Sequence, residues 1–239
     1  MTDSPTPATK RRPYMRPRDA ATLILCDRTP SGLHVLMGKR HEGHKFMPGK
    51  FVFPGGAVEP DDRRMPIAGP LDEVVEQKLL ARTQRTSSDY ARGLALAAIR
   101  ETFEETGLAV GASDVGAPEA PPNEAWARFA ATGVFPALDG LDLIARAITP
   151  PDRPKRFDAR FFAADASLIA HETKGVVGPE AELVELVWTK LEKALELDLA
   201  NVTRAVLGDL AALGAGPVDR FRPRPFYHMQ HGKRLREML

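Results

Sequence analysis

The stretch from Ser87 to Leu108 constrains the fold more than any other, because it predicts a helix with two chemically opposed faces. Ser87 is a residue type that caps helix starts, and Gly107 is the type that ends helices. Residues three and four positions apart share one face of a helix. The apolar face holds Leu96, Ile99 and Phe103, and the opposite face holds Glu101, Glu104 and Glu105. We expect the apolar face to dock on a sheet.

The acidic face of this helix needs positive charge, because three carboxylates within one turn repel one another. Arg100 can pair with Glu104 but cannot balance all three acids. Crowded oxygen ligands are what hard cations such as Mg²⁺ or Mn²⁺ prefer. A solvated acidic face is the alternative. Ala97 and Ala98, expected on the acidic side, would let a ligand or another chain approach closely.

Short apolar runs between turn residues predict the other elements of the chain. We expect strands at residues 21–27, 33–39, 51–53, 141–148, 160–163 and 183–188, and helices at 71–82, 124–131, 191–199 and 202–213. Strands and helices are mixed without regular βαβ alternation, which favours an α+β fold with helices packed on a mixed sheet.

Two segments resemble the halves of the Nudix box, the motif of the Nudix hydrolases. Residues 100–107, Arg-Glu-x-x-Glu-Glu-x-Gly, resemble the second half, and residues 53–59, with Gly55, Gly56 and Glu59, resemble the first half. The resemblance implies a Nudix fold, with a mixed sheet sandwiched between helices. It also implies metal-dependent hydrolysis of the pyrophosphate bond in a nucleoside diphosphate derivative.

The resemblance carries over to individual residues. It implies that the Gly55 carbonyl and the side chains of Glu101, Glu104 and Glu105 hold one or more Mg²⁺ or Mn²⁺ ions. The same three glutamates and Arg100 would then be the catalytic residues, with Arg100 orienting the acids.

The box departs from the family pattern at two points. Asp62 stands where the box has a glutamate, and a helical insertion of about 30 residues, expected at 63–90, separates the two halves. A surface loop tolerates such an insertion because closure entropy grows slowly with length. A split box of this kind resembles the coenzyme A diphosphatases of the Nudix 19 type and their bacterial relatives. Further matches are Arg40, Phe46-Met47-Pro48-Gly49 and residues 149–162.

Three functions follow from this resemblance. The first is hydrolysis of coenzyme A or acyl-coenzyme A, and the second is hydrolysis of ADP-ribose, NADH or a dinucleoside polyphosphate. The third is a non-catalytic nucleotide-binding or RNA-binding regulator built on the Nudix fold. The intact set of three glutamates argues against the third, since a binding protein does not need these acids.

Two further roles stay open at the level of sequence. A carboxylate must accept the proton of the attacking water, and Glu101 is one candidate for this general base. The others lie on a later segment: Glu180, Glu182 and Glu185. Arg40 and Arg156 are the cations predicted to bind substrate phosphates, with solvated loop cations as the alternative reading.

Composition limits the partners of the chain. Its 239 residues include 33 basic and 32 acidic ones, and this net charge of +1 argues against a nucleic-acid partner. No segment reaches the ~18 apolar residues of a membrane span, so we expect no membrane partner and a cytoplasmic location. A homodimer stays open. We expect a flexible basic tail at residues 1–18, a Nudix domain at 19–200, and a helix followed by a basic tail at 201–239.

Overall fold

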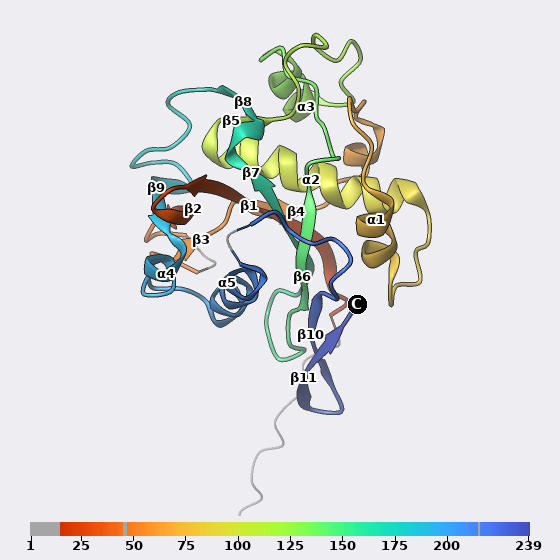
Figure 1. Ribbon diagram of the computed structural model, residues 1–239, viewed down its shortest axis with the longest axis vertical. Coiled ribbons are helices and arrows are strands. Elements are labelled where there is room, and N and C mark those ends of the chain that lie inside the picture. The colour runs from red at the N-terminus through yellow and green to blue at the C-terminus, as the bar shows by residue number, and fades with distance from the viewer. Residues whose placement is uncertain (1–14, 45–46, 215) are drawn as a thin grey trace, which may run out of the picture.

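The computed structural model describes residues 15–44, 47–214 and 216–239. Most of the basic tail predicted at residues 1–18, and Phe46 of the matched segment, lie outside this range. The described strands form one mixed sheet in the order β11-β10-β6-β7-β1-β2-β3, with β4 paired to β1 and β9 paired to β2. A separate two-stranded sheet joins β5 and β8. Figure 1 shows the large sheet between helices, with α2 crossing one face and α4 and α5 on the other.

The strands have the following bounds: β1 (Arg18–Thr29), β2 (Gly32–Arg40), β3 (Phe51–Val52), β4 (Gly55–Ala57), β5 (Leu108–Val110), β6 (Asp142–Ile148), β7 (Phe157–Asp165), β8 (Ile169–Glu172), β9 (Leu183–Lys190), β10 (Pro225–Gln230) and β11 (Lys233–Met238). The α-helices are α1 (Glu73–Leu80), α2 (Ser88–Thr106), α3 (Glu124–Ala130), α4 (Leu191–Ala194) and α5 (Asn201–Leu213). Two short 3₁₀ helices are η1 (Pro60–Arg64) and η2 (Ala166–Leu168).

Strand β1 divides the core into two layers. Leu23 and Leu25 pack in the layer that contains α1, α2 and α3, whereas Ile24 and Cys26 pack in the layer that contains α4 and α5. Because both faces of this strand are covered, its sequence is a continuous apolar run rather than an alternating one. β1 lies parallel to β7 and antiparallel to β2 and β4. The α+β fold with a mixed sheet between helices is thereby confirmed.

Helix α2 has the ends that its sequence predicts. The Ser87 hydroxyl accepts a hydrogen bond from the amide of Tyr90, and Gly107 ends the helix with φ +78°. The expectation for Ala97 and Ala98 is wrong, because both are fully buried in the core. Residues of α1 and α3 belong to the same core cluster, so these alanines admit the protein's own helices rather than a ligand.

The C-terminal residues differ from the basic tail predicted for them. Residues 225–238 form a hairpin of β10 and β11, and β10 lies parallel to β6 in the large sheet. Phe226 is buried, and the buried Arg224 guanidinium donates from Nε to the Leu143 carbonyl at 2.5 Å. These two buried side chains anchor the hairpin despite the charges of β11. No helix in the described ranges is long and apolar enough to cross a membrane.

Candidate active site

The two halves of the motif meet where β4 lies against the C-terminal part of α2. The Gly55 amide donates to Oε2 of Glu105 at 3.3 Å. A Cβ atom on Gly56 would lie 2.5 Å from both carboxylate oxygens of Glu101, and one on Gly55 would lie 2.6 Å from the Ala21 carbonyl oxygen. Glycine is therefore required at position 55 for β4 to pair with β1, and a side chain at position 56 would push the Glu101 carboxylate out of its place.

Arg100 joins the acids to the loop half of the motif. Its Nε and Nη2 donate to the two carboxylate oxygens of Asp62 at 2.8 and 3.2 Å. Its Nη1 donates to Glu101 at 2.8 Å and Glu104 at 3.3 Å, and its Nη2 donates to the Ala57 carbonyl at 2.9 Å. A guanidinium has five N–H donors, and these five acceptors use them all. Arg100 thus orients the acids from a buried position.

Asp62 is a buried anchor for Arg100. Its side chain is fully buried and also accepts from Trp126 Nε1 at 3.1 Å and from the Glu59 amide at 2.8 Å. A carboxylate enclosed by these donors has no exposed oxygen to offer an ion. The segment expected as an insertion begins directly after Asp62, runs through α1 and ends in the first turn of α2.

The three glutamates are partly or fully withdrawn from solvent, so they do not form the solvated acidic face of the alternative reading. The side chains of Glu101 and Glu104 are 15% and 28% exposed, and Glu105 is 8% exposed. Burial raises the pKa of Glu101 to about 7, although Arg100 opposes the rise. Burial raises the pKa of Glu104 as well, against the charges of Arg100 and Arg128.

Glu105 has the most strongly perturbed environment of the three. Burial raises its pKa well above the ordinary value, the charges of Glu182 and Glu101 add to the rise, and Arg40 opposes it. Carboxylates in such surroundings lack compensating positive charge, which a bound cation would supply.

The donor set has the chemistry of a hard-cation site, although the ion position is not preformed. Within residues 15–44, 47–214 and 216–239, no three carboxylate, imidazole or thiolate groups already converge on one point. Glu101 and Glu104 instead contact Arg100, and Glu105 contacts the Gly55 amide. The three acids offer only oxygen ligands, from one helical turn beside two glycines, which fits Mg²⁺ or Mn²⁺.

Arg40 and Glu182 lie beside Glu105. The Arg40 guanidinium is buried at the end of β2 and donates from Nη2 to Oε1 of Glu182 at 2.5 Å. The His41 amide donates to the Glu182 carbonyl at 3.0 Å, which fixes the backbone there. Both side chains affect the pKa of Glu105, in opposite directions. The other two candidate bases on this segment, Glu180 and Glu185, are exposed like Glu182. In the part of the chain that the structure describes, neither forms a hydrogen bond or ion pair with Arg40, and neither is among the charges that raise the pKa of Glu105.

Arg156 does not join this group. It is buried, and its guanidinium donates to the backbone carbonyls of Thr149 at 3.0 Å and Met15 at 2.6 Å. These bonds fasten the turn between β6 and β7 to the residues that precede β1. The substrate-binding role predicted for Arg156 gains no support from such contacts, because they use the guanidinium to hold backbone.

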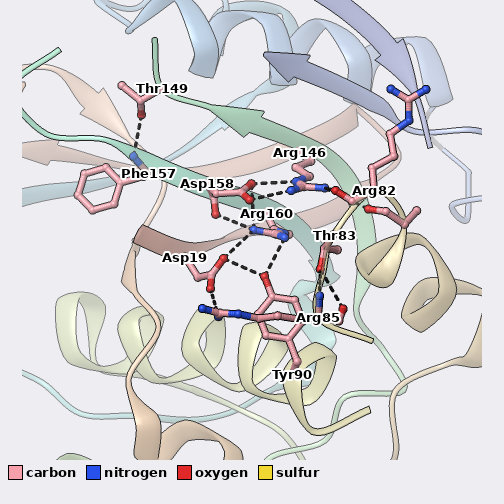
Figure 2. A network of polar contacts seen from close by, with 11 residues as sticks. Asp19, Arg82, Thr83, Arg85, Tyr90, Arg146, Thr149, Phe157, Asp158 and Arg160 are labelled. Carbon is pink, nitrogen blue, oxygen red and sulfur yellow. Dashed lines mark hydrogen bonds and ion pairs between the residues drawn. The ribbon is translucent and has the colours of Figure 1, made fainter. Parts of the chain in front are cut away.

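A buried polar network, shown in Figure 2, fixes the inserted segment to the sheet. The Tyr90 hydroxyl, in the first turn of α2, donates to Asp19 at 2.8 Å and accepts from Arg160 at 3.0 Å. Asp158 holds Arg160 at 2.9 Å and accepts two bonds from Arg146 at 2.8 and 2.7 Å. The sequence analysis did not identify this network or the role of Trp126, because no motif spacing connects residues so far apart.

Comparison with known proteins finds similarity among solved structures alone. No family model matches the chain, and no curated protein matches it. Among solved structures, a NUDIX hydrolase from Alicyclobacillus acidocaldarius is 29% identical, with a TM-score of 0.62 over 84% of this chain and 99% of that one. A MutT protein from Bacillus halodurans is 14% identical, with a TM-score of 0.46 over 92% and 97% of the two chains.

A Nudix hydrolase from M. smegmatis, RenU, is 17% identical, with a TM-score of 0.42 over 82% of this chain and 84% of that one. The likenesses to this protein and to the MutT protein are too distant to support any inference. The Alicyclobacillus structure has the same fold along almost its whole length. Together with the box reassembled around Arg100, it identifies the chain as a Nudix-type diphosphate hydrolase.

Proposed function

We propose that the chain hydrolyses the pyrophosphate bond of coenzyme A or acyl-coenzyme A, with Mg²⁺ or Mn²⁺ as the cofactor. The observation that carries this proposal is the meeting of Gly55, Gly56 and three partly buried glutamates around one saturated arginine. The choice of coenzyme A rests on the split box and the matched segments around it. The products would be a 3′,5′-adenosine bisphosphate and a phosphopantetheine.

The side chains that would hold the metal are Glu101, Glu104 and Glu105, together with the Gly55 carbonyl. When bound, a divalent ion neutralises charge on the diphosphate and makes attack by water easier. The protein's own groups hold the reacting parts in place. Arg100 fixes Glu101 and Glu104 from beneath, so that their carboxylates stay on one face of α2.

Glu182 is our choice of general base among the four candidates. Arg40 holds its carboxylate at 2.5 Å, the side chain is 42% exposed and open to water, and its charge acts on Glu105. Glu101, at 15% exposed, is less open to water and is itself one of the proposed metal ligands. In the step we propose, a water oxygen bonds to phosphorus, the bond from phosphorus to the leaving phosphate oxygen breaks, and the water proton passes to Glu182. Arg40 is then a positioning residue.

Glu182→Gln is expected to lower kcat about a hundredfold with little change in KM, because the amide cannot accept the proton of the attacking water. Initial rates at saturating Mg²⁺ measure this effect. Glu185→Gln, which changes an exposed acid on β9, is the matched control and should keep the wild-type rate. A Glu182→Gln enzyme as fast as the control would refute this assignment and return the role to Glu101.

A substrate panel tests the proposed function directly. The purified chain is incubated with coenzyme A, acetyl-coenzyme A, ADP-ribose, NADH and diadenosine tetraphosphate, each with Mg²⁺ or Mn²⁺. We expect fastest hydrolysis of the coenzyme A compounds, with the two predicted products. If another member of the panel is hydrolysed faster, its compound class replaces coenzyme A as the proposed substrate. Failure to hydrolyse any member with either metal would instead support a nucleotide-binding or RNA-binding regulator.

A further inference from the structure

A depression in the surface begins where the acidic face of α2 ends. It lies between the C-terminal turn of α2, the end of α3, and β8 with the loop after it, and its volume is about 640 Å³. Its lining includes Phe103, Glu104, Arg128, Thr132, His171 and Val176. Because Glu104 lines the depression and also belongs to the three acids Glu101, Glu104 and Glu105, which we call the acidic trio, a ligand that contacts the trio can extend into the depression.

The depression presents two basic side chains that the fold leaves without partners. The exposed side chains of Arg128 on α3 and His171 on β8 make no hydrogen bond or ion pair with any part of the chain that the structure describes. Arg100, Arg146 and Arg160, by contrast, are each held by carboxylates. Arg128 lines the same depression as Glu104, which places it beside the acidic trio. The side chains of Arg128 and His171 are therefore available to a ligand that lies beside the three glutamates.

The shape and walls of the depression suit one end of a nucleotide. Phe103 forms part of the wall and is held edge-on by Phe129, with ring centroids 5.3 Å apart. Val176 adds a second apolar surface, and the Thr132 hydroxyl is tied to the Phe129 carbonyl at 2.7 Å. Small-molecule sites of ~300–1,000 Å³ combine apolar walls with a few polar groups in this way.

We propose that Arg128 and His171 bind a phosphate monoester that the substrate carries in addition to its scissile diphosphate. This inference rests on the proposed function, because the acidic trio and its cation already account for the diphosphate. A guanidinium binds phosphate oxygens through two parallel N–H donors, which makes Arg128 the main contact. The only acid in the lining is Glu104, and the proposed cation would offset its charge. Arg128 is therefore the residue that would select substrates with a further phosphate.

Pairs of substrates that differ by one phosphate test this proposal. Coenzyme A is compared with dephospho-coenzyme A, and NADPH with NADH, in the wild type and in Arg128→Gln and Arg128→Lys. For the preferred pair, we expect the wild type to favour the phosphorylated member at least about tenfold in kcat/KM. Arg128→Gln should abolish that preference mainly through KM, and Arg128→Lys should keep part of it. The more affected pair shows which ribose position carries the phosphate.

The control separates this result from a general effect of charge. Arg234→Gln makes the same change on β11, at an exposed residue of the C-terminal hairpin. It should leave the ratio of kcat/KM values within each substrate pair unchanged. If Arg128→Gln lowers kcat/KM equally for both members of a pair, or lowers it for neither member, the proposed role of Arg128 is overturned. Wild-type hydrolysis of coenzyme A upholds the proposed function whatever Arg128 does, whereas hydrolysis of NADPH or NADH alone would replace its substrate and still leave the role of Arg128 testable on that pair.

Should the wild type hydrolyse none of the four compounds, the proposed function fails while the phosphate site can still be tested. Calorimetric titration with 3′,5′-adenosine bisphosphate and with AMP needs no turnover. We then expect tighter binding of the bisphosphate by the wild type and equal binding of both by Arg128→Gln. Equal binding by the wild type would overturn the site as well.

Discussion

Glu104→Gln is expected to lower turnover more than tenfold while the protein stays folded. The substitution keeps the size of the side chain but removes a charged ligand from the acidic trio, and tenfold corresponds to about 1.4 kcal/mol of transition-state stabilisation. Glu104 makes the longest of the bonds to Arg100, at 3.3 Å, and it is the most exposed of the three acids, so folding should depend on it least. Steady-state rates measure the loss of turnover, and a Mg²⁺ titration measures the effect of losing a charged ligand.

Glu124→Gln provides the matched control for this experiment. It makes the same change at an exposed acid in the first turn of α3 and should leave kcat and the Mg²⁺ dependence as in the wild type. Unchanged turnover in Glu104→Gln would remove that residue from the proposed site. A fall in turnover accompanied by loss of the folded circular-dichroism spectrum would show a structural role instead.

Asp62→Ala is expected to have the largest effect on stability, a loss of about 3–5 kcal/mol in the free energy of unfolding. It removes two of the five acceptors of the buried Arg100 and leaves the Trp126 indole N–H without its Asp62 partner as well. Urea denaturation measures the change. Asp61→Ala on the same 3₁₀ helix removes an exposed ion pair with Arg64, for which about 1 kcal/mol or less is expected.

The comparison of these two variants distinguishes an anchor from a metal ligand. Equal loss of stability in Asp62→Ala and Asp61→Ala would contradict the anchoring role of Asp62. Asp62→Asn adds a second measurement, because it keeps the shape of the side chain. Its Mg²⁺ affinity should match that of the wild type, whereas a large loss of affinity in a folded Asp62→Asn protein would make the residue a ligand.

The elements that could be predicted from sequence are those with local signals at both ends. Helix α2 has its serine cap, its glycine stop and a two-faced pattern between them, so both its bounds and its acidic face could be derived. Strand β4 could not, because Gly55–Ala57 has almost no side chains to form a pattern and pairs with a strand more than 30 residues away. The C-terminal hairpin was hidden in the same way, since its charged strand β11 lies at the edge of the sheet and β10 pairs with the distant β6.

The residues of the candidate site also differ in whether they lie close together in the sequence. The three glutamates lie within one turn, so helical spacing alone places them together. The bonds from Asp62 to Arg100 and to Trp126 span 38 and 64 residues, and no spacing rule connects such positions. Glu182 could be separated from Glu180 and Glu185 only after β2 and β9 had been paired. The sequence likewise gives no sign that the Arg156 guanidinium is buried and donates to the backbone carbonyls of Thr149 and Met15.

The two clamps at the ends of the insertion have a consequence for how this enzyme can vary. Asp62 is locked to Arg100 at one end, and Tyr90 is locked to Asp19 and Arg160 at the other. Movements of the intervening segment are therefore stopped at fixed points before they reach the carboxylates. The exposed positions between the clamps can drift in evolution while the geometry of the glutamates is preserved, whereas buried residues of the segment such as Val75 and Leu79 must stay apolar because they pack in the core.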